Sequence, residues 1–133
     1  VMEKIIVQIG WCDNYCAASD EILGCVACSD TIEGIKKEYR SALDFHIKGM
    51  LEDGDELPEK LKNEYELVFE LDTSAMLHSL DGIVTRKAIA KVTGINEALL
   101  THYANGFRKP RPVQRQRIID GIHQIGRELT LIG

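Results

Sequence analysis

The sequence lacks any apolar run approaching the roughly 20 residues that cross a bilayer. Its first residues also lack the basic region and the apolar stretch of a secretory signal. We therefore expect no membrane span and a cytoplasmic location.

Internal repeats and low-complexity segments are missing as well. The 133 residues are 44% hydrophobic and 28% charged, which is an ordinary composition for a globular protein and indicates neither disorder nor a fibrous class. The length suits one domain or two small domains that share a boundary.

Basic residues are scarce in the first part of the chain, and acidic residues are scarce in the second. Residues 1–72 contain 7 Lys and Arg against 17 Asp and Glu, a net charge of -10, whereas residues 73–133 contain 9 against 4, a net charge of +5. The basic part is suited to phosphates, and the acidic part is suited to a basic protein. We therefore expect two domains, 1–72 and 73–133, with different partners.

The four cysteines, Cys12, Cys16, Cys25 and Cys28, all lie near the start of the chain. Cys25 and Cys28 have the spacing of half a zinc site, but they fall in a strand-like run, where an odd separation places them on opposite faces. We expect small buried hydrophobic side chains and no metal or cofactor. A zinc site and a disulfide are the alternatives.

Patterns in residues 1–72 predict three strands, a helix and a fourth strand. The strands are expected at 3–10, 15–18, 24–28 and 65–71. Asp30, with Glu33 three residues later, predicts the start of the helix, which should end at Asp53-Gly54 before an acidic loop. From Thr73 onward only short helical segments are indicated, so the fold class is α+β.

Residues 85–103, TRKAIAKVTGINEALLTHY, have the spacing of a helix-turn-helix. Ala90 is small enough for two helices to cross closely, and Gly94 suits the positive φ of the turn. Thr85 and Asn96 are cap residues for the two helices. The residues expected to build this scaffold are Ile89, Ala90, Gly94, Ile95, Leu100 and Tyr103.

If the second of these helices enters a major groove, one of its faces would read bases and flanking residues would bind phosphates. Base contacts are expected from Asn96, Glu97, Ala98, Thr101 and His102. Phosphate contacts are expected from Thr85, Arg86, Lys87, Asn105, Arg108, Lys109 and Arg111. The alternative is a generic pair of packed helices.

Residues 103–112, YANGFRKPRP, resemble the loop that ends the recognition helix in phage-repressor-like (Xre-type) domains, and the resemblance spans about residues 74–130. A last helix beyond Pro112 has an apolar stripe that suits either the domain core or a homodimer seam. Its members are Ile118, Ile122, Ile125 and Leu129. A dimer would pair two half-sites about 34 Å apart.

Two further segments, GCVACSDTIEG at 24–34 and ALDFHIKGMLEDGDELP at 42–58, resemble the HicB antitoxin family over about residues 3–72. Ile22-Leu23 and Ser29 depart from the family pattern at the entry to the helix. The resemblance implies a partial RNase H-like fold, a small basic HicA-like ribonuclease toxin as partner, and repression of the protein's own operon through the C-terminal domain. The alternative is a stand-alone transcription regulator with a ligand-binding or dimerising N-terminal domain.

A nuclease activity is not expected, because the apolar run of the first strand, residues 5–9, offers only Gln8 and no carboxylate for a catalytic metal ion. His46 lies on the apolar stripe of the long helix and is interpreted as a packing residue. Trp11 is either a lid on the core or a contact for the toxin. We therefore expect a binding protein that is not an enzyme.

Overall fold

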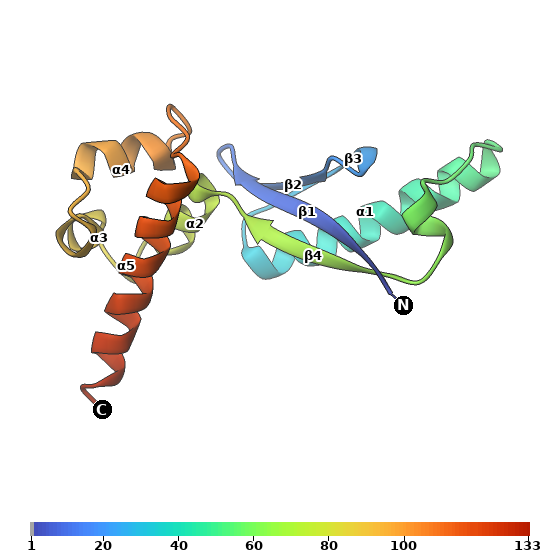
Figure 1. Ribbon diagram of the computed structural model, residues 1–133. Helices are drawn as coiled ribbons and strands as arrows, with labels where there is room; N and C mark the ends of the chain where they lie inside the picture. Colours follow the sequence, from blue (N-terminus) through green and yellow to red (C-terminus); the bar gives the residue numbers. More distant parts are fainter. Residues whose placement is uncertain (1) are drawn as a thin grey trace. The chain divides into compact units, whose positions relative to one another are not determined.

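The computed structural model describes residues 2–133 and divides into two compact units, 1–72 and 73–133. Unit 1 contains the whole sheet, and unit 2 is built from helices alone (Figure 1). The expected α+β class, with a strand-rich first part followed by helices, is confirmed.

Unit 1 is a four-stranded mixed sheet with one long helix across it (Figure 1). The strand order is β3-β2-β1-β4, in which β1 and β2, and β2 and β3, pair antiparallel while β1 and β4 pair parallel. The predicted element order is confirmed, and a short 3-10 helix, η1, precedes β4. The elements are β1 (Glu3–Trp11), β2 (Tyr15–Ser19), β3 (Ile22–Ser29), α1 (Ile32–Glu52), η1 (Glu59–Lys62) and β4 (Tyr65–Leu71).

Alternation along β1 explains which face of the sheet α1 covers. Ile5, Val7 and Ile9 are fully buried, whereas Ile6 between them is exposed. Successive strand residues point to opposite faces, so the odd-numbered residues of β1 form the core with α1 and the even-numbered ones lie on an open face. The buried residues of α1 are Ile35, Tyr39 and Leu43.

The start of α1 differs from the prediction. Thr31 rather than Asp30 is the N-cap, and its side chain accepts a hydrogen bond from the Gly34 amide at 2.9 Å. Both residues are competent caps, and the extended backbone of Thr31 (φ -131°, ψ 157°) decides between them. The end is as predicted, at Asp53, followed by Gly54 with φ +75°.

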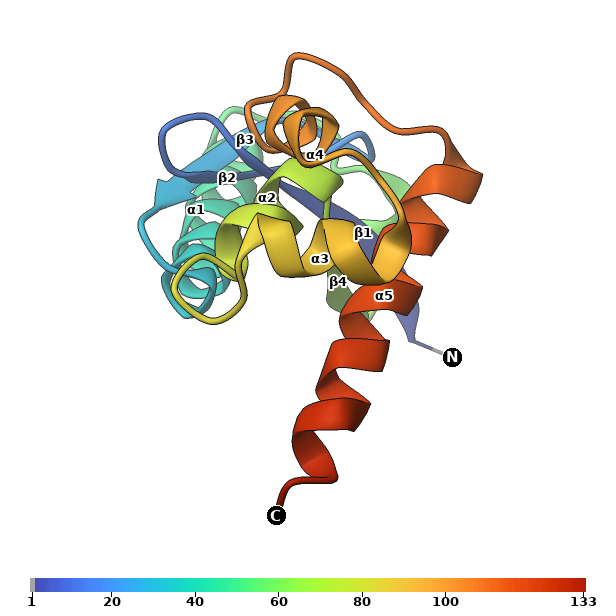
Figure 2. The same ribbon diagram turned by 90° about the vertical axis from the view of Figure 1, so that its left-hand side faces the viewer.

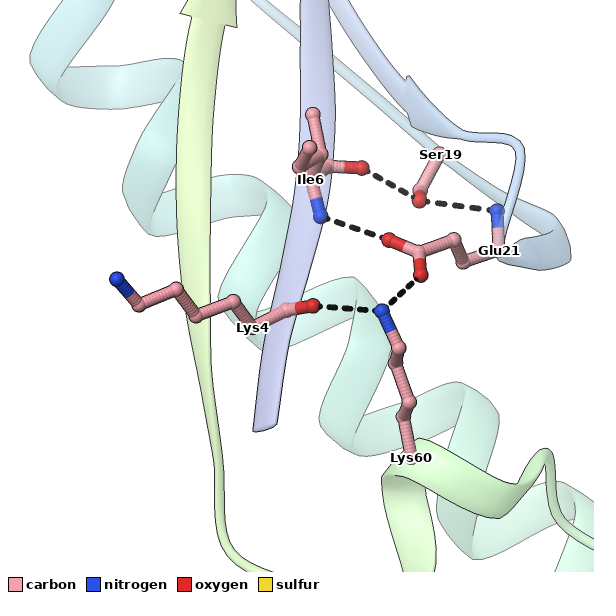
Figure 3. A network of polar contacts seen from close by, with 5 residues as sticks. All are labelled: Lys4, Ile6, Ser19, Glu21 and Lys60. Atoms are coloured by element: carbon pink, nitrogen blue, oxygen red, sulfur yellow. Dashed lines mark hydrogen bonds and ion pairs between the residues drawn. The ribbon is translucent and has the colours of Figure 1, made fainter. Parts of the chain in front are cut away.

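β2 is shorter than β1 and pairs with it only from Gln8 to Trp11. At Ile6, side chains make the backbone hydrogen bonds that β2 would otherwise provide (Figure 3). The Glu21 carboxylate accepts from the Ile6 amide at 2.9 Å, and Ser19 Oγ donates to the Ile6 carbonyl at 2.6 Å. Lys60 of η1 donates to the Lys4 carbonyl at 2.9 Å and pairs with Glu21. The exposed part of β1 therefore has its backbone groups satisfied, and η1 is tied to the sheet.

The expectation of four buried cysteines is wrong for three of them. Cys25 alone is buried, with Cys12 and Cys28 exposed and Cys16 partly exposed. Cys25 points toward α1, where burial raises the pKa of its thiol, while Cys16 and Cys28 lie on the open face of the sheet.

Unit 2 consists of four helices around a small apolar core: α2 (Thr73–Ser79), α3 (Arg86–Thr93), α4 (Glu97–Ala104) and α5 (Pro112–Thr130). In Figure 1 α4 lies lengthwise and α3 is seen nearly end-on, and Figure 2, turned by 90°, reverses this. The two helices therefore cross at a steep angle. The buried core residues are Leu77, Ile89, Ile95, Leu100, Tyr103, Ala104 and Ile118.

α5 packs closely on α3 at Gly121. A Cβ atom at this position would overlap Thr93 Cγ2 and lie 3.3 Å from Val92 Cγ2. Ile118 is buried in the core, Ile122 and Ile125 pack against it in part, and Leu129 is 57% exposed. The apolar stripe thus belongs to the domain core in its first half and is uncovered in its last turns, which extend beyond α3 (Figures 1 and 2). No helix in residues 2–133 has both the length and the apolar character of a membrane span.

Candidate nucleic-acid interface

The α3 helix begins at a side-chain cap and a pair of charges. Thr85 Oγ1 accepts a hydrogen bond from the Ala88 amide at 3.0 Å. The Arg86 guanidinium lies 3.6 Å from the Asp81 carboxylate and is half-buried, with an Nε atom that has no hydrogen-bond partner among the residues described. Arg86 therefore helps to hold the start of α3 and is less available to a phosphate than Lys87, which is exposed.

The turn between α3 and α4 is built around Gly94. Its φ of +74° is left-handed, and its amide donates to the Ala90 carbonyl at 2.9 Å. Thr93 Oγ1 donates to the Ile89 carbonyl at 2.7 Å and accepts from the Ile95 amide at 3.2 Å. Ile95 is buried directly after the turn, which fixes where α4 starts.

The α4 helix is amphipathic, with one side buried in the core of unit 2 and the other exposed. Leu100, Tyr103 and Ala104 face the core and are buried. The Ala104 carbonyl at its end accepts hydrogen bonds from Ser74 Oγ at 2.6 Å and from His78 Nε2, as the N–H tautomer, at 2.9 Å. Side chains of α2 thus hold the C-terminal end of α4 in place.

The residues expected to contact bases lie together on the other side of α4. Asn96, Glu97, Ala98 and His102 are exposed, and Thr101 is partly exposed. Asn96 Oδ1 accepts from the Ala98 amide at 2.8 Å as the N-cap, so its side-chain NH₂ is the group left for an outside acceptor. The face can therefore offer hydrogen-bond donors, a carboxylate and two small apolar groups to a ligand.

Exposed cations lie in the helix before α4 and in the loop after it. Lys87 is at the start of α3, and Arg108, Lys109 and Arg111 follow α4 in the loop to α5. All four are exposed, and none of them makes an ion pair within residues 2–133. Asn105, the C-cap of α4, is also exposed. Unpaired guanidinium and ammonium groups around an exposed helix are suited to binding phosphates.

Sequence reasoning missed two contributors to this surface. Arg117 of α5 donates to the Thr93 carbonyl at 2.7 Å and to Gln114 at 3.1 Å, so it fastens α5 to the turn. Phe107, in the loop after α4, is 75% exposed, and its ring centroid lies 6.0 Å from that of His102. An exposed aromatic ring beside arginines in YANGFRKPRP was the signal that could have identified it.

Unit 1 has a separate groove of about 480 Å³ between α1 and the edge strand β3. Phe45 on its rim is 79% exposed and Val26 is 62% exposed. His46 lines the groove and is only partly buried, so it lies at a surface rather than in the core. Asp53 and Asp55 lie at one end of the groove, which gives it an apolar wall beside negative charge.

Trp11 is partly exposed at the end of β1 and packs edge-on against Tyr15, with ring centroids 4.9 Å apart. Among residues 2–133 no three His, Cys, Asp or Glu side chains come together as a metal site would require.

No family model matches the chain. The chain is similar to an uncharacterized 14.9 kDa protein from the rep-hol intergenic region of Haemophilus phage HP1. The two are 27% identical over 108 residues, which cover 79% of this chain and 80% of the phage protein.

Proposed function

We propose that the protein is an antitoxin of the HicA/HicB type that binds a small basic ribonuclease toxin through unit 1 and represses its own operon through unit 2. The observation that carries the proposal is the exposed face of α4, presented by the α3–Gly94–α4 turn and flanked by exposed unpaired cations. Its role is binding, without catalysis, in the cytoplasm, where operator and toxin meet.

The DNA-binding part follows from geometry and charge. An α-helix fits the major groove, and α4 has its apolar side in the core and its polar side uncovered. Base discrimination would come from Asn96, His102 and the methyl groups of Ala98 and Thr101. Much of the affinity would come from Lys87 and the cations between α4 and α5, because phosphate contacts dominate affinity in such complexes.

The partner-binding part follows from charge and the groove. Residues 1–72 have a net charge of -10, which attracts a cationic protein. The groove beside Phe45 provides an apolar surface for an anchor residue of that protein, and Asp53 and Asp55 provide a complement to its charge. The HicB resemblance supports a HicA-like toxin as this partner.

A homodimer is part of the proposal. A single small DNA-binding unit reads one half-site, and two-fold proteins pair two of them. Leu129 in the last turn of α5 is 57% exposed, and Leu131 and Ile132, just after the helix, are 85% and 83% exposed. A second copy of α5 would bury them.

Two exposed phenylalanines allow the two activities to be tested separately. The protein is co-expressed with its flanking reading frames, purified, and assayed for a bound small basic protein and for retardation of DNA from upstream of its own gene. Phe45→Ser should weaken the protein complex and leave DNA binding intact, whereas Phe107→Ser should do the reverse.

Because both rings are largely exposed, neither variant should unfold the protein. DNA binding without a copurifying protein would favour a stand-alone regulator, in which unit 1 binds a ligand or dimerises. Failure of the protein to bind its own upstream DNA, with and without its neighbours' products, would contradict the proposal.

A further inference from the structure

Two thiols face each other on the open side of the sheet, in the hairpin formed by β2 and β3. Cys16 and Cys28 are paired in the strand register, and their Sγ atoms are 2.8 Å apart. Tyr15 and Ala17, on either side of Cys16, are buried toward α1. Cys16 therefore points away from the core, to the same side as Cys28.

This geometry is close to that of a disulfide. A disulfide bond is about 2.0 Å long and joins Cα atoms about 4.4–6.8 Å apart, a window that contains the roughly 4.5–5.5 Å between opposed residues of antiparallel strands. Bond formation therefore needs a small movement of two side chains and no rearrangement of the backbone.

The pair is accessible, and its competitors are separated from it. Cys28 is exposed and Cys16 partly exposed, whereas Cys25 is buried on the opposite face. The hydrogen bond with Cys28 and partial burial raise the pKa of Cys16 to about 11, so Cys16 remains a thiol at neutral pH. The exposed Cys28 is then the sulfur that first meets a reagent in solvent.

We propose that Cys16 and Cys28 form a redox modification site that is oxidised by small disulfides of the glutathione class. The deprotonated Cys28 sulfur attacks one sulfur of the small disulfide and releases one small thiolate, which leaves a mixed disulfide on Cys28. Cys16 loses its proton to solvent and attacks the Cys28 sulfur, which releases the second small thiolate. Two protein thiols are oxidised by two electrons, and one small disulfide is reduced to two thiols.

The modification has a defined structural effect. The bond closes a segment of 13 residues, 16 to 28, and fastens the edge strand β3 to β2. Val26 and Gly24 of β3 line the groove against α1, so oxidation restrains one wall of that groove. The site does not depend on the proposed function, because its chemistry requires only the hairpin.

The test equilibrates the folded full chain in mixtures of reduced and oxidised glutathione. It then blocks the remaining thiols with an alkylating reagent in denaturant, so that the buried Cys25 also reacts, and measures the intact mass. The wild type should lose two of its four alkylation sites under oxidising conditions, and peptide mapping should identify a Cys16–Cys28 link. Cys12→Ser, the matched control, should lose two of its three alkylation sites and form the same link. In Cys16→Ser, Cys28 should stop at the glutathione adduct, which peptide mapping distinguishes from any adduct on the exposed Cys12.

Circular dichroism verifies that each variant is folded, and Cys16→Ala replaces Cys16→Ser if the hydroxyl disturbs the sheet. Four alkylated thiols in the wild type at every glutathione ratio would overturn the proposal. A link that involves Cys12 or Cys25 in place of this pair would also overturn it.

Discussion

The close approach of α5 to α3 can be tested with two glycines of the same helix. Gly121 is buried against Thr93 and Val92, whereas Gly126 has nothing within 4 Å of the position that a Cβ would take. Gly→Ala in a helix interior is worth about 0.5–1 kcal/mol in backbone propensity. Gly126→Ala should therefore stabilise unit 2 by about that amount.

Gly121→Ala gains the same propensity but forces its methyl group into Thr93 Cγ2. Overpacking of this kind costs about 1–3 kcal/mol. Propensity cancels between the two variants, so Gly121→Ala should be less stable than Gly126→Ala by about 1–3 kcal/mol. For a domain of this size each kcal/mol shifts Tm by about 4–8 °C, which thermal unfolding followed by circular dichroism resolves readily.

A third substitution isolates the contact. Thr93→Ser removes Cγ2 and keeps the hydroxyl that bonds the Ile89 carbonyl and the Ile95 amide. Combined with Gly121→Ala, it should recover most of the lost stability. The double variant should therefore be more stable than the sum of the two single effects predicts. Equal stability of Gly121→Ala and Gly126→Ala, or no recovery in the double variant, would refute the packing of α5 on α3 described above.

Three other predictions follow from single groups. Arg108→Ala should weaken binding to operator and random DNA about equally and reduce the slope of log affinity against log salt by roughly one charge; an unchanged slope in a salt titration would exclude a phosphate contact. In urea titration, Tyr39→Phe should leave the free energy of unfolding unchanged or raise it. The buried Tyr39 hydroxyl has no oxygen or nitrogen partner among residues 2–133 and lies beside the Cys25 thiol. A loss of stability above about 1 kcal/mol would indicate a real hydrogen bond. Lys60 and the Ile6 amide hold the pKa of Glu21 below its usual range. The carboxylate therefore stabilises the fold fully at pH values above the ordinary glutamate pKa of about 4.5. This stabilisation is lost as the pH falls through the lower pKa that Glu21 has in the folded protein. The stability advantage of wild type over Glu21→Gln should therefore shrink at acid pH, and a constant difference across that range would contradict this ion pair.

Local patterns were sufficient to predict most of the elements. The alternation of Tyr65–Leu71 gave the bounds of β4, and the Asp53-Gly54 pair gave the end of α1, because both signals depend on neighbouring residues alone. The prediction of Asp30 as the N-cap was wrong, because the next residue, Thr31, can also cap a helix and local sequence does not fix which of the two has the extended backbone of a cap.

Long-range pairings could not be predicted from local patterns. Cys16 and Cys28 face each other because of the hairpin register, which depends on an irregularity between Ala18 and Ser19. The Glu21–Lys60 pair joins residues 39 positions apart. In unit 2 the exposed face of α4 was foreseen from spacing, but the engagement of Arg86 with Asp81 depends on how the preceding loop folds.

The central claim is that α4 enters a major groove, and one added charge tests it directly. Ala98 is exposed at the start of α4, where a carboxylate also favours the helix, so Ala98→Glu should fold normally while placing negative charge against the DNA. His123→Glu adds a carboxylate at an exposed site on α5 and serves as the control. With DNA from upstream of its own gene, binding should weaken at least tenfold, about 1.4 kcal/mol, for Ala98→Glu and stay near wild type for His123→Glu. Equal affinities of wild type and both variants would contradict the account.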